Sequence, residues 1–205
     1  AGILKAPQDW KGSQNGTIAY GYGFSSTSLQ LVSAVNAVAN GGVYVSPKFV
    51  RATIDENGSK WETPSGSSHR VISEESAATM TEMLTGVVCE GTGSRAQVGG
   101  ISVAGKTGTA NRFNDKCRCY SGYTASFIGF APAEKPRFVM SITIQDPKGI
   151  HWGGYLGGPV FKEVISYALK SYQIAPSGKL NEPYPLDAAT LKKREKITAA
   201  AEVKD

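Results

Sequence analysis

The residues with the clearest chemical potential lie between positions 103 and 110, which read Val-Ala-Gly-Lys-Thr-Gly-Thr-Ala. A short apolar run leads into Lys106, Thr107, Gly108 and Thr109, a pattern typical of an edge strand that presents polar groups to a cleft. An ammonium and two hydroxyls can hold a carboxylate by charge-assisted hydrogen bonds. Backbone N–H groups can also stabilise the negative charge that develops on a carbonyl oxygen during acyl transfer.

Each of these residue types has an expected role. Lys106 would supply a positive field, and Thr107 and Thr109 would bind the carboxylate through their hydroxyls. The backbone N–H of Thr109 would form one half of an oxyanion hole. Gly108 has no Cβ and would let the strand approach its substrate closely. The sequence therefore predicts Lys106 and Thr109 as catalytic residues, and Thr107, Gly108 and Thr109 as substrate-binding residues.

The same stretch also fits a nucleotide-binding pattern, because residues 100–107 satisfy G-x-x-x-x-G-K-[ST]. That phosphate-binding loop requires an apolar strand before its first glycine and a helix that opens at the lysine. Residues 93–99 do not read as a buried strand, and residues 108–115 carry no helical apolar stripe. The context therefore argues against a phosphate-binding loop.

Length and composition set the broad class of the protein. A chain of 205 residues with 40% hydrophobic residues can bury one proper core. No apolar run approaches the roughly 20 residues that span a bilayer. The net charge of +5 is mild and favours anionic surfaces such as a cell wall, while no basic run with interleaved aromatics indicates nucleic acid. The chain opens at Ala1 with neither an initiator methionine nor a signal peptide, so we expect a piece of a longer polypeptide.

Several elements must position the Lys-Thr-Gly strand. The spacing of apolar residues predicts helices that follow residues 25–28, Ser73 and Pro159, a hairpin over 49–63 that turns at 55–58, and strands over 123–131 and 138–146. Residues 138–146 alternate apolar with polar side chains, which is typical of a half-buried antiparallel strand. From Lys179 onward the chain becomes polar, and we expect a surface tail there.

The three cysteines leave their pairing open. Cys117 and Cys119 are so close in sequence that a bridge between them is expected to be strained. A disulfide from Cys89 to either of them would be compatible with an oxidising, extracytoplasmic setting. Three free thiols are the alternative, and a zinc site would lack its fourth ligand.

Short motifs occur in order along most of the chain: YGYGFSSTSLQL at 20–31, ANGG at 39–42, EGTG at 90–93, KTGTA at 106–110, FIGFAPA at 127–133, PRF at 136–138, GG at 153–154 and GPVF at 158–161. Together they resemble the class B penicillin-binding proteins, which are monofunctional peptidoglycan D,D-transpeptidases. The similarity covers about residues 1–175.

The resemblance implies an α+β fold in which helices flank an antiparallel sheet, as in the transpeptidase domain shared by penicillin-binding proteins and serine β-lactamases. Residues 1–178 would form the C-terminal part of that domain, and residues 179–205 a polar tail. In the family, the terminal helix packs on a five-stranded sheet. No cofactor and no metal are implied.

The resemblance also implies a function. The parent protein would cross-link stem peptides that end in D-Ala-D-Ala through a serine acyl-enzyme, and it would bind β-lactam antibiotics covalently. It would lie on the extracytoplasmic face of a bacterial cytoplasmic membrane, held by an N-terminal segment outside these residues. Its partners would be a cell-wall synthesis and division complex, and not nucleic acid.

One family motif is missing from the chain. No serine is followed by lysine three residues later, although Ser-x-x-Lys carries the nucleophile and its base in this family. In the family, that motif and Ser-x-Asn lie upstream, so we expect these residues alone to be inactive. A non-catalytic β-lactam sensor and a serine β-lactamase on the same fold remain the alternatives.

Overall fold

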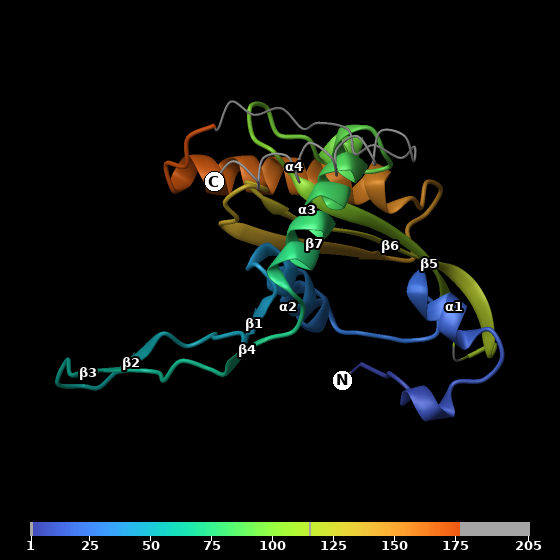
Figure 1. Cartoon of the computed structure of the whole chain (residues 1–205), viewed down its shortest axis with the longest axis horizontal. Coiled ribbons are helices and arrows are strands. Elements are labelled where there is room, and N and C mark those ends of the chain that lie inside the picture. Colours follow the sequence, from blue (N-terminus) through green and yellow to red (C-terminus); the bar gives the residue numbers. More distant parts are fainter. Residues whose placement is uncertain (1, 115, 177–205) are drawn as a thin grey trace, which may run out of the picture.

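The computed structural model describes residues 2–114 and 116–176 of the chain. Its centre is an antiparallel sheet of three strands in the order β5-β6-β7, which cover Ala104–Asn114, Cys119–Ala131 and Phe138–Gln145 (Figure 1). The antiparallel sheet flanked by helices confirms the predicted fold class. The expected tail over residues 179–205 lies outside the described residues.

Helices cover both faces of this sheet. The helices are α1 (Gln14–Ala19), α2 (Ser28–Ala39), α3 (Glu74–Cys89) and α4 (Gly153–Ser171), with short 3-10 helices η1 (Pro7–Asp9) and η2 (Ser94–Ala96). Figure 1 shows α4 along one face of the sheet and α2 on the opposite face. Within the described ranges, no helix is both long enough and apolar enough to cross a bilayer.

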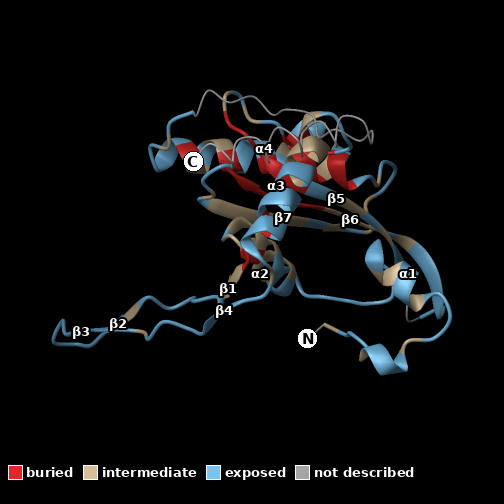
Figure 2. Cartoon of the chain, viewed as in Figure 1, coloured by how far each residue is buried: buried red, intermediate tan, exposed pale blue. Residues whose placement is uncertain are grey.

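The core is divided by the alternation of side chains along β6. Phe127 and Ala131 pack with Phe161 of α4 on one face, while Phe130 packs against α2 on the other. Phe127 and Phe161 are completely buried, and their ring centroids lie 5.0 Å apart. Figure 2 shows the buried residues concentrated where α4 meets the sheet. This packing fixes the position of α4 relative to β5 and β6.

The strand β7 confirms its predicted pattern. Phe138, Met140 and Ile142 are partly buried and pack against the α4 side of the core, and Val139 packs on the α2 side. Because successive side chains of a strand point to opposite faces, Phe138, Met140 and Ile142 share the face of β7 that packs against the α4 side of the core.

Two helices begin at the predicted polar residues. Thr27 and Gln30 form a reciprocal capping box at the start of α2, and the Ser73 side chain accepts a hydrogen bond from the Ser76 N–H at the start of α3. Such caps satisfy N–H groups that have no partner inside the helix.

The start of the last helix was predicted wrongly. Proline at the first helical position is favourable, so the sequence pointed to Pro159. The helix α4 instead begins at Gly153, and Pro159 lies inside it. The physical reason is the close approach of the glycine pair Gly153-Gly154 to the sheet, described below.

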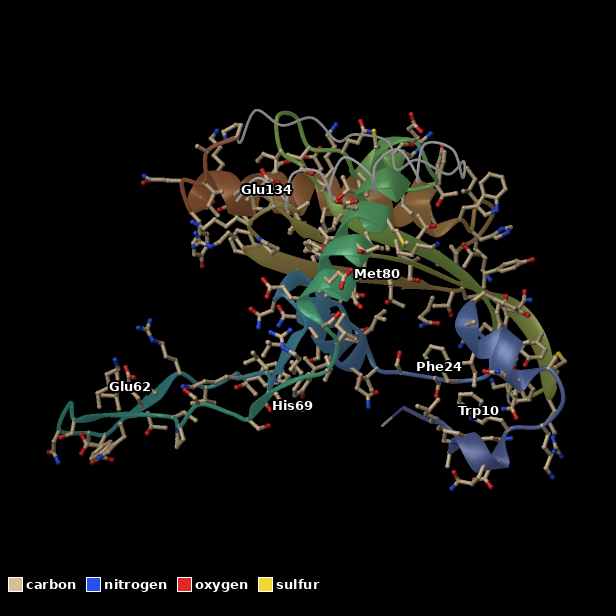
Figure 3. The ribbon with its side chains drawn as sticks, in the orientation of Figure 1. Trp10, Phe24, Glu62, His69, Met80 and Glu134 are labelled. Carbon is tan, nitrogen blue, oxygen red and sulfur yellow. A yellow bond between two sulfur atoms is a disulfide. The ribbon has the colours of Figure 1, made fainter. Side chains whose placement is uncertain are left out.

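A β-arm extends away from the body of the protein. In it, β1 (Val43–Val45) pairs with β4 (Ser68–Arg70), and β2 (Ala52–Ile54) pairs with β3 (Lys60–Glu62). The hairpin over 49–63 is therefore confirmed, and β4 is a strand that was not predicted from the sequence. Figure 3 shows Glu62 on the projecting part of the arm, with His69 nearer the body.

Candidate functional site

The Lys-Thr-Gly-Thr sequence lies within β5, which forms one margin of the described three-stranded sheet. Thr107 pairs with Phe127 and Thr109 with Ala125 on β6. The other edge of β5 is unpaired within the described residues. Lys106 therefore lies in an edge strand and not at the start of a helix, which excludes the phosphate-binding loop.

The alternation of the strand separates the predicted site residues into two groups. Thr107 and Thr109 point to the α4 side, because side chains two residues apart share a face. A pocket of about 410 Å³ lies there, lined by Thr92, Ser94, Arg95, Thr107, Thr109, Trp152, Gly153, Gly154 and Tyr155. Lys106 does not line this pocket, and its Nζ donates to the carbonyl oxygen of Thr107 at 2.8 Å.

Each of the two pocket hydroxyls has a fixed partner. The Oγ1 atoms of Thr92 and Thr107 lie 2.7 Å apart and share a hydrogen bond. The backbone N–H of Gly153 donates to Thr109 Oγ1 at 3.3 Å. Because this contact uses Thr109 as an acceptor, its own O–H proton is left to donate to a ligand. The arrangement therefore holds both hydroxyls in place and leaves the Thr109 hydroxyl as a donor.

Three glycines allow these elements to lie this close. A Cβ at Gly108 would collide with the Ser126 hydroxyl of the neighbouring strand. A Cβ at Gly153 would collide with the carbonyl oxygens of Gly108 and Ser126, and one at Gly154 would meet the Thr92 carbonyl oxygen. The first turn of α4 therefore packs directly against the backbone of β5 and β6. Its N-terminal N–H groups and positive dipole end lie at the pocket.

Charge and aromatic surface surround the hydroxyls. The guanidinium carbon of Arg95 lies 3.9 Å from the ring centroid of Tyr155, which is a cation–π contact. Trp152, which precedes α4, is 64% exposed beside the same pocket. His151 stacks on Tyr123 of β6, with ring centroids 3.8 Å apart. A charged or apolar ligand group could therefore find a partner at this end of β5.

Sequence reasoning did not assign Thr92, Arg95 or Trp152 to the site. A usable signal existed for two of them, because Thr92 belongs to the EGTG motif and Trp152 directly precedes the Gly153-Gly154 pair. Both motifs contributed to the family resemblance, but the sequence did not predict that they lie next to Thr107 in the fold. Arg95 carries no comparable sequence signal.

The disulfide from Cys89 to Cys117 or Cys119, one of the pairings that the sequence left open, is wrong, because the structure joins Cys117 to Cys119. The strands β5 and β6 form one long hairpin, and its tip carries both residues away from the end of α3 (Figure 1). Arg118 adopts a φ of 51°, and the turn brings the two Cα atoms to 5.2 Å, a spacing that a disulfide can bridge. Burial and the adjacent Glu90 carboxylate raise the pKa of the Cys89 thiol.

Comparison with known proteins adds a family assignment to this geometry. Residues 1–166 match the family described as the penicillin binding protein transpeptidase domain. The penicillin-binding protein PbpB of Mycolicibacterium smegmatis is 36% identical over 92% of this chain and 31% of its own length. Stage V sporulation protein D of Bacillus subtilis is 36% identical over 80% of this chain and 26% of its own length. The peptidoglycan D,D-transpeptidase FtsI of Escherichia coli is 29% identical over 86% of this chain and 29% of its own length.

Solved structures agree with the sequence comparisons. Penicillin-binding protein 3 of Mycobacterium tuberculosis, solved with ampicillin, superposes with a TM-score of 0.83 at 33% identity, over 92% of this chain and 44% of that one. The transpeptidase domain of Burkholderia pseudomallei penicillin-binding protein 3 gives a TM-score of 0.72 at 33% identity, over 86% and 51%. The present chain thus spans about a third of the curated relatives and about half of the matched structures.

Proposed function

The chain belongs to the penicillin-binding protein transpeptidase family, and we propose that it forms the carboxylate-binding side of a peptidoglycan D,D-transpeptidase. The observation that carries the proposal is the pair of hydroxyls of Thr107 and Thr109, held on the edge strand β5 beside the first turn of α4. Two hydroxyls held in a pocket at a strand edge, of which Thr109 keeps its proton to donate, suit the terminal carboxylate of a D-Ala-D-Ala peptide.

In the proposed reaction, a serine outside these 205 residues attacks the carbonyl carbon of the penultimate D-Ala. The C–N bond breaks, D-Ala leaves with a proton on its amine, and the peptide remains as a serine ester. The amine of a neighbouring strand then attacks that ester, forms the cross-linking amide and returns the proton to the serine oxygen. A β-lactam follows the first step only, because its opened ring stays attached to the ester.

Each site residue has a role in this scheme. Thr107 and Thr109 hold the carboxylate, and Gly108 lets β5 and β6 approach closely. The Thr109 N–H contributes to the oxyanion hole, since preorganised backbone donors stabilise the tetrahedral intermediate. Lys106 lies on the other face of the strand and supplies a positive field at the same edge. Removing one oxyanion donor typically costs about 10²–10³ in rate.

We further propose the cellular setting of the parent protein. It would act on the extracytoplasmic face of a bacterial cytoplasmic membrane, held by a segment outside these residues. There it would work with a cell-wall synthesis and division complex. Residues 1–178 would be the C-terminal part of its transpeptidase domain, followed by a tail over 179–205. What supports a role in the cell wall is that relatives are named as a penicillin-binding protein and a peptidoglycan D,D-transpeptidase.

The proposal is tested by acylation of the full-length parent with a fluorescent penicillin. Intact parent should be labelled covalently and release the label slowly. Thr107→Val and Thr109→Val each remove a hydroxyl that bonds a charged group, and should lower the acylation rate constant by roughly 10- to 100-fold. Thr53→Val makes the same change on the exposed strand β2 and should label like the wild type.

Other outcomes separate the alternatives. Absence of labelling of a folded parent would refute the proposed function. Rapid release of hydrolysed penicillin would identify a β-lactamase. Stable labelling without cross-linking of D-Ala-D-Ala substrates would identify a non-catalytic sensor. The family match and the named D,D-transpeptidases among the relatives favour the transpeptidase.

A further inference from the structure

The pocket beside Thr107 and Thr109 contains a cation that the proposed mechanism leaves without a role. Arg95 lies on η2, and its side chain lines the same pocket as the two hydroxyls. No aspartate or glutamate occurs among the residues that line this pocket. Lys106, the cation that the sequence predicted here, is absent from the lining. The positive charge on the hydroxyl side of β5 therefore comes from Arg95.

The charge of Arg95 is not neutralised by a neighbouring acid in the described part of the chain. The ion pairs there are Lys60–Glu62 and Lys148–Asp146, and neither includes Arg95. The guanidinium lies over the ring of Tyr155, with 3.9 Å between the guanidinium carbon and the ring centroid. An aromatic face holds a guanidinium without consuming its N–H donors, so these donors stay free for an anion.

Both partners of this stack are fixed by the backbone. Arg95 is followed by the completely buried Ala96. A Cβ at Gly158 of α4 would approach the Arg95 Cβ to 3.1 Å, so η2 lies tightly against α4. Tyr155 lies in the first turn of α4. The backbone thus fixes where the exposed Arg95 side chain begins, and the contact with Tyr155 holds its guanidinium beside the pocket.

We propose that Arg95 is a specificity-determining residue that binds the carboxylate of the acyl donor together with Thr107 and Thr109. The ligand class is a peptide or β-lactam whose carboxylate lies next to the reacting amide. The fork of the guanidinium donates two N–H groups to the carboxylate, and the threonine hydroxyls donate from β5. Tyr155 positions the guanidinium through the stack. The inference rests on the proposed function.

The test compares a charged and a neutral probe on the full-length parent. Acylation rate constants are measured with benzylpenicillin and with its uncharged methyl ester. Arg95→Gln should lower the rate constant for the acid by about 10- to 100-fold, the usual range for a lost hydrogen bond to a charged group. It should leave the rate constant for the ester unchanged. Arg95→Lys keeps the charge without the fork and should fall between the wild type and Arg95→Gln.

Two further variants guard against a trivial explanation. Arg51→Gln removes the same charge from an exposed position before β2, and both probes should react as with the wild type. Tyr155→Leu removes the stack while retaining the charge, and should weaken acylation by the acid with little change for the ester. Thermal melting of each variant verifies that it is folded.

The outcomes distinguish this inference from the proposed function. Suppose that the wild type is labelled. Arg95 does not recognise the carboxylate if Arg95→Gln reacts with the acid as fast as the wild type does, or if its rate constants for the acid and the ester fall by the same factor. If the wild type is labelled by neither probe, the proposed function itself fails. The assignment is supported if Arg95→Gln lowers the acylation rate constant for the acid but not for the ester, and if Arg95→Lys gives an intermediate rate constant for the acid.

Discussion

The hydroxyl of Thr109 shows how a single side chain can be prepared for a ligand. It accepts a hydrogen bond from the Gly153 N–H, which leaves its proton as a donor. The Thr107 hydroxyl is held by a hydrogen bond with the hydroxyl of Thr92, 15 residues earlier in the chain, in which either oxygen can donate. A fixed donor loses little entropy when it binds, so the two threonines should favour a rigid planar anion such as a carboxylate.

At the level of single residues, the sequence predicted the hydroxyls but not their surroundings. The sequence placed Thr107 and Thr109 on an edge strand beside a cleft, and both residues do line the pocket. The period of two in a strand places Lys106 on the other face, and this rule alone could have separated the cation from the hydroxyls. Arg95 and Thr92 reach the pocket only through the packing of η2 and α4, which no local pattern encodes.

The cysteines give a testable prediction at this scale. Mass mapping of a non-reduced digest should find Cys117 and Cys119 joined within one peptide, with Cys89 outside that bond. Because the pKa of the Cys89 thiol is raised by burial and by Glu90, its thiolate fraction at neutral pH is lowered. It should therefore react with a maleimide more slowly than Cys117 and Cys119 do after reduction. A disulfide that contains Cys89 would contradict the structure.

At the level of elements, the sequence predicted those helix starts and turns that are set by hydrogen bonds between residues close in the chain. Thr27 and Ser73 cap α2 and α3, and the Asp55 carboxylate accepts from the N–H groups of Asn57 and Ser59 in the turn between β2 and β3. The start of α4 was missed for the opposite reason. Glycines disfavour a helix by intrinsic propensity, and only contact with the sheet explains why α4 begins at Gly153.

That contact predicts the effect of one added methyl group. Gly153→Ala would place a Cβ against the backbone carbonyls of Gly108 and Ser126, so α4 must shift away from β5. The Gly153 N–H would then release the Thr109 hydroxyl. We expect a loss of stability of about 1–3 kcal/mol from overpacking. We also expect a fall in penicillin acylation of the parent of up to about 10²-fold, since small misplacements at a site are costly.

The matched control for this variant is Gly99→Ala, because a Cβ there meets nothing within 4 Å. Its melting temperature and acylation rate should stay close to those of the wild type. The measurements are thermal unfolding and the rate of penicillin labelling. If Gly153→Ala labels at the wild-type rate, the first turn of α4 does not position Thr109.

At the level of the whole molecule, the proposed function assigns one side of a reaction site to the described fold. The family assignment and the strand-edge pocket agree, yet no serine in the chain is followed by lysine three residues later. Ser94 does line the pocket, but it lies at the start of η2 with Arg95 next to it and no lysine in the lining. Without a base within reach, a serine hydroxyl is a weak nucleophile at neutral pH.

The 205 residues expressed alone should therefore not be acylated by penicillin, even when circular dichroism and a cooperative melt show that they are folded. The full-length parent, treated in parallel, should be labelled on a serine outside this chain. Mass spectrometry of the labelled peptides identifies that residue directly. An adduct on Ser94 would mean that the pocket beside Thr107 contains its own nucleophile.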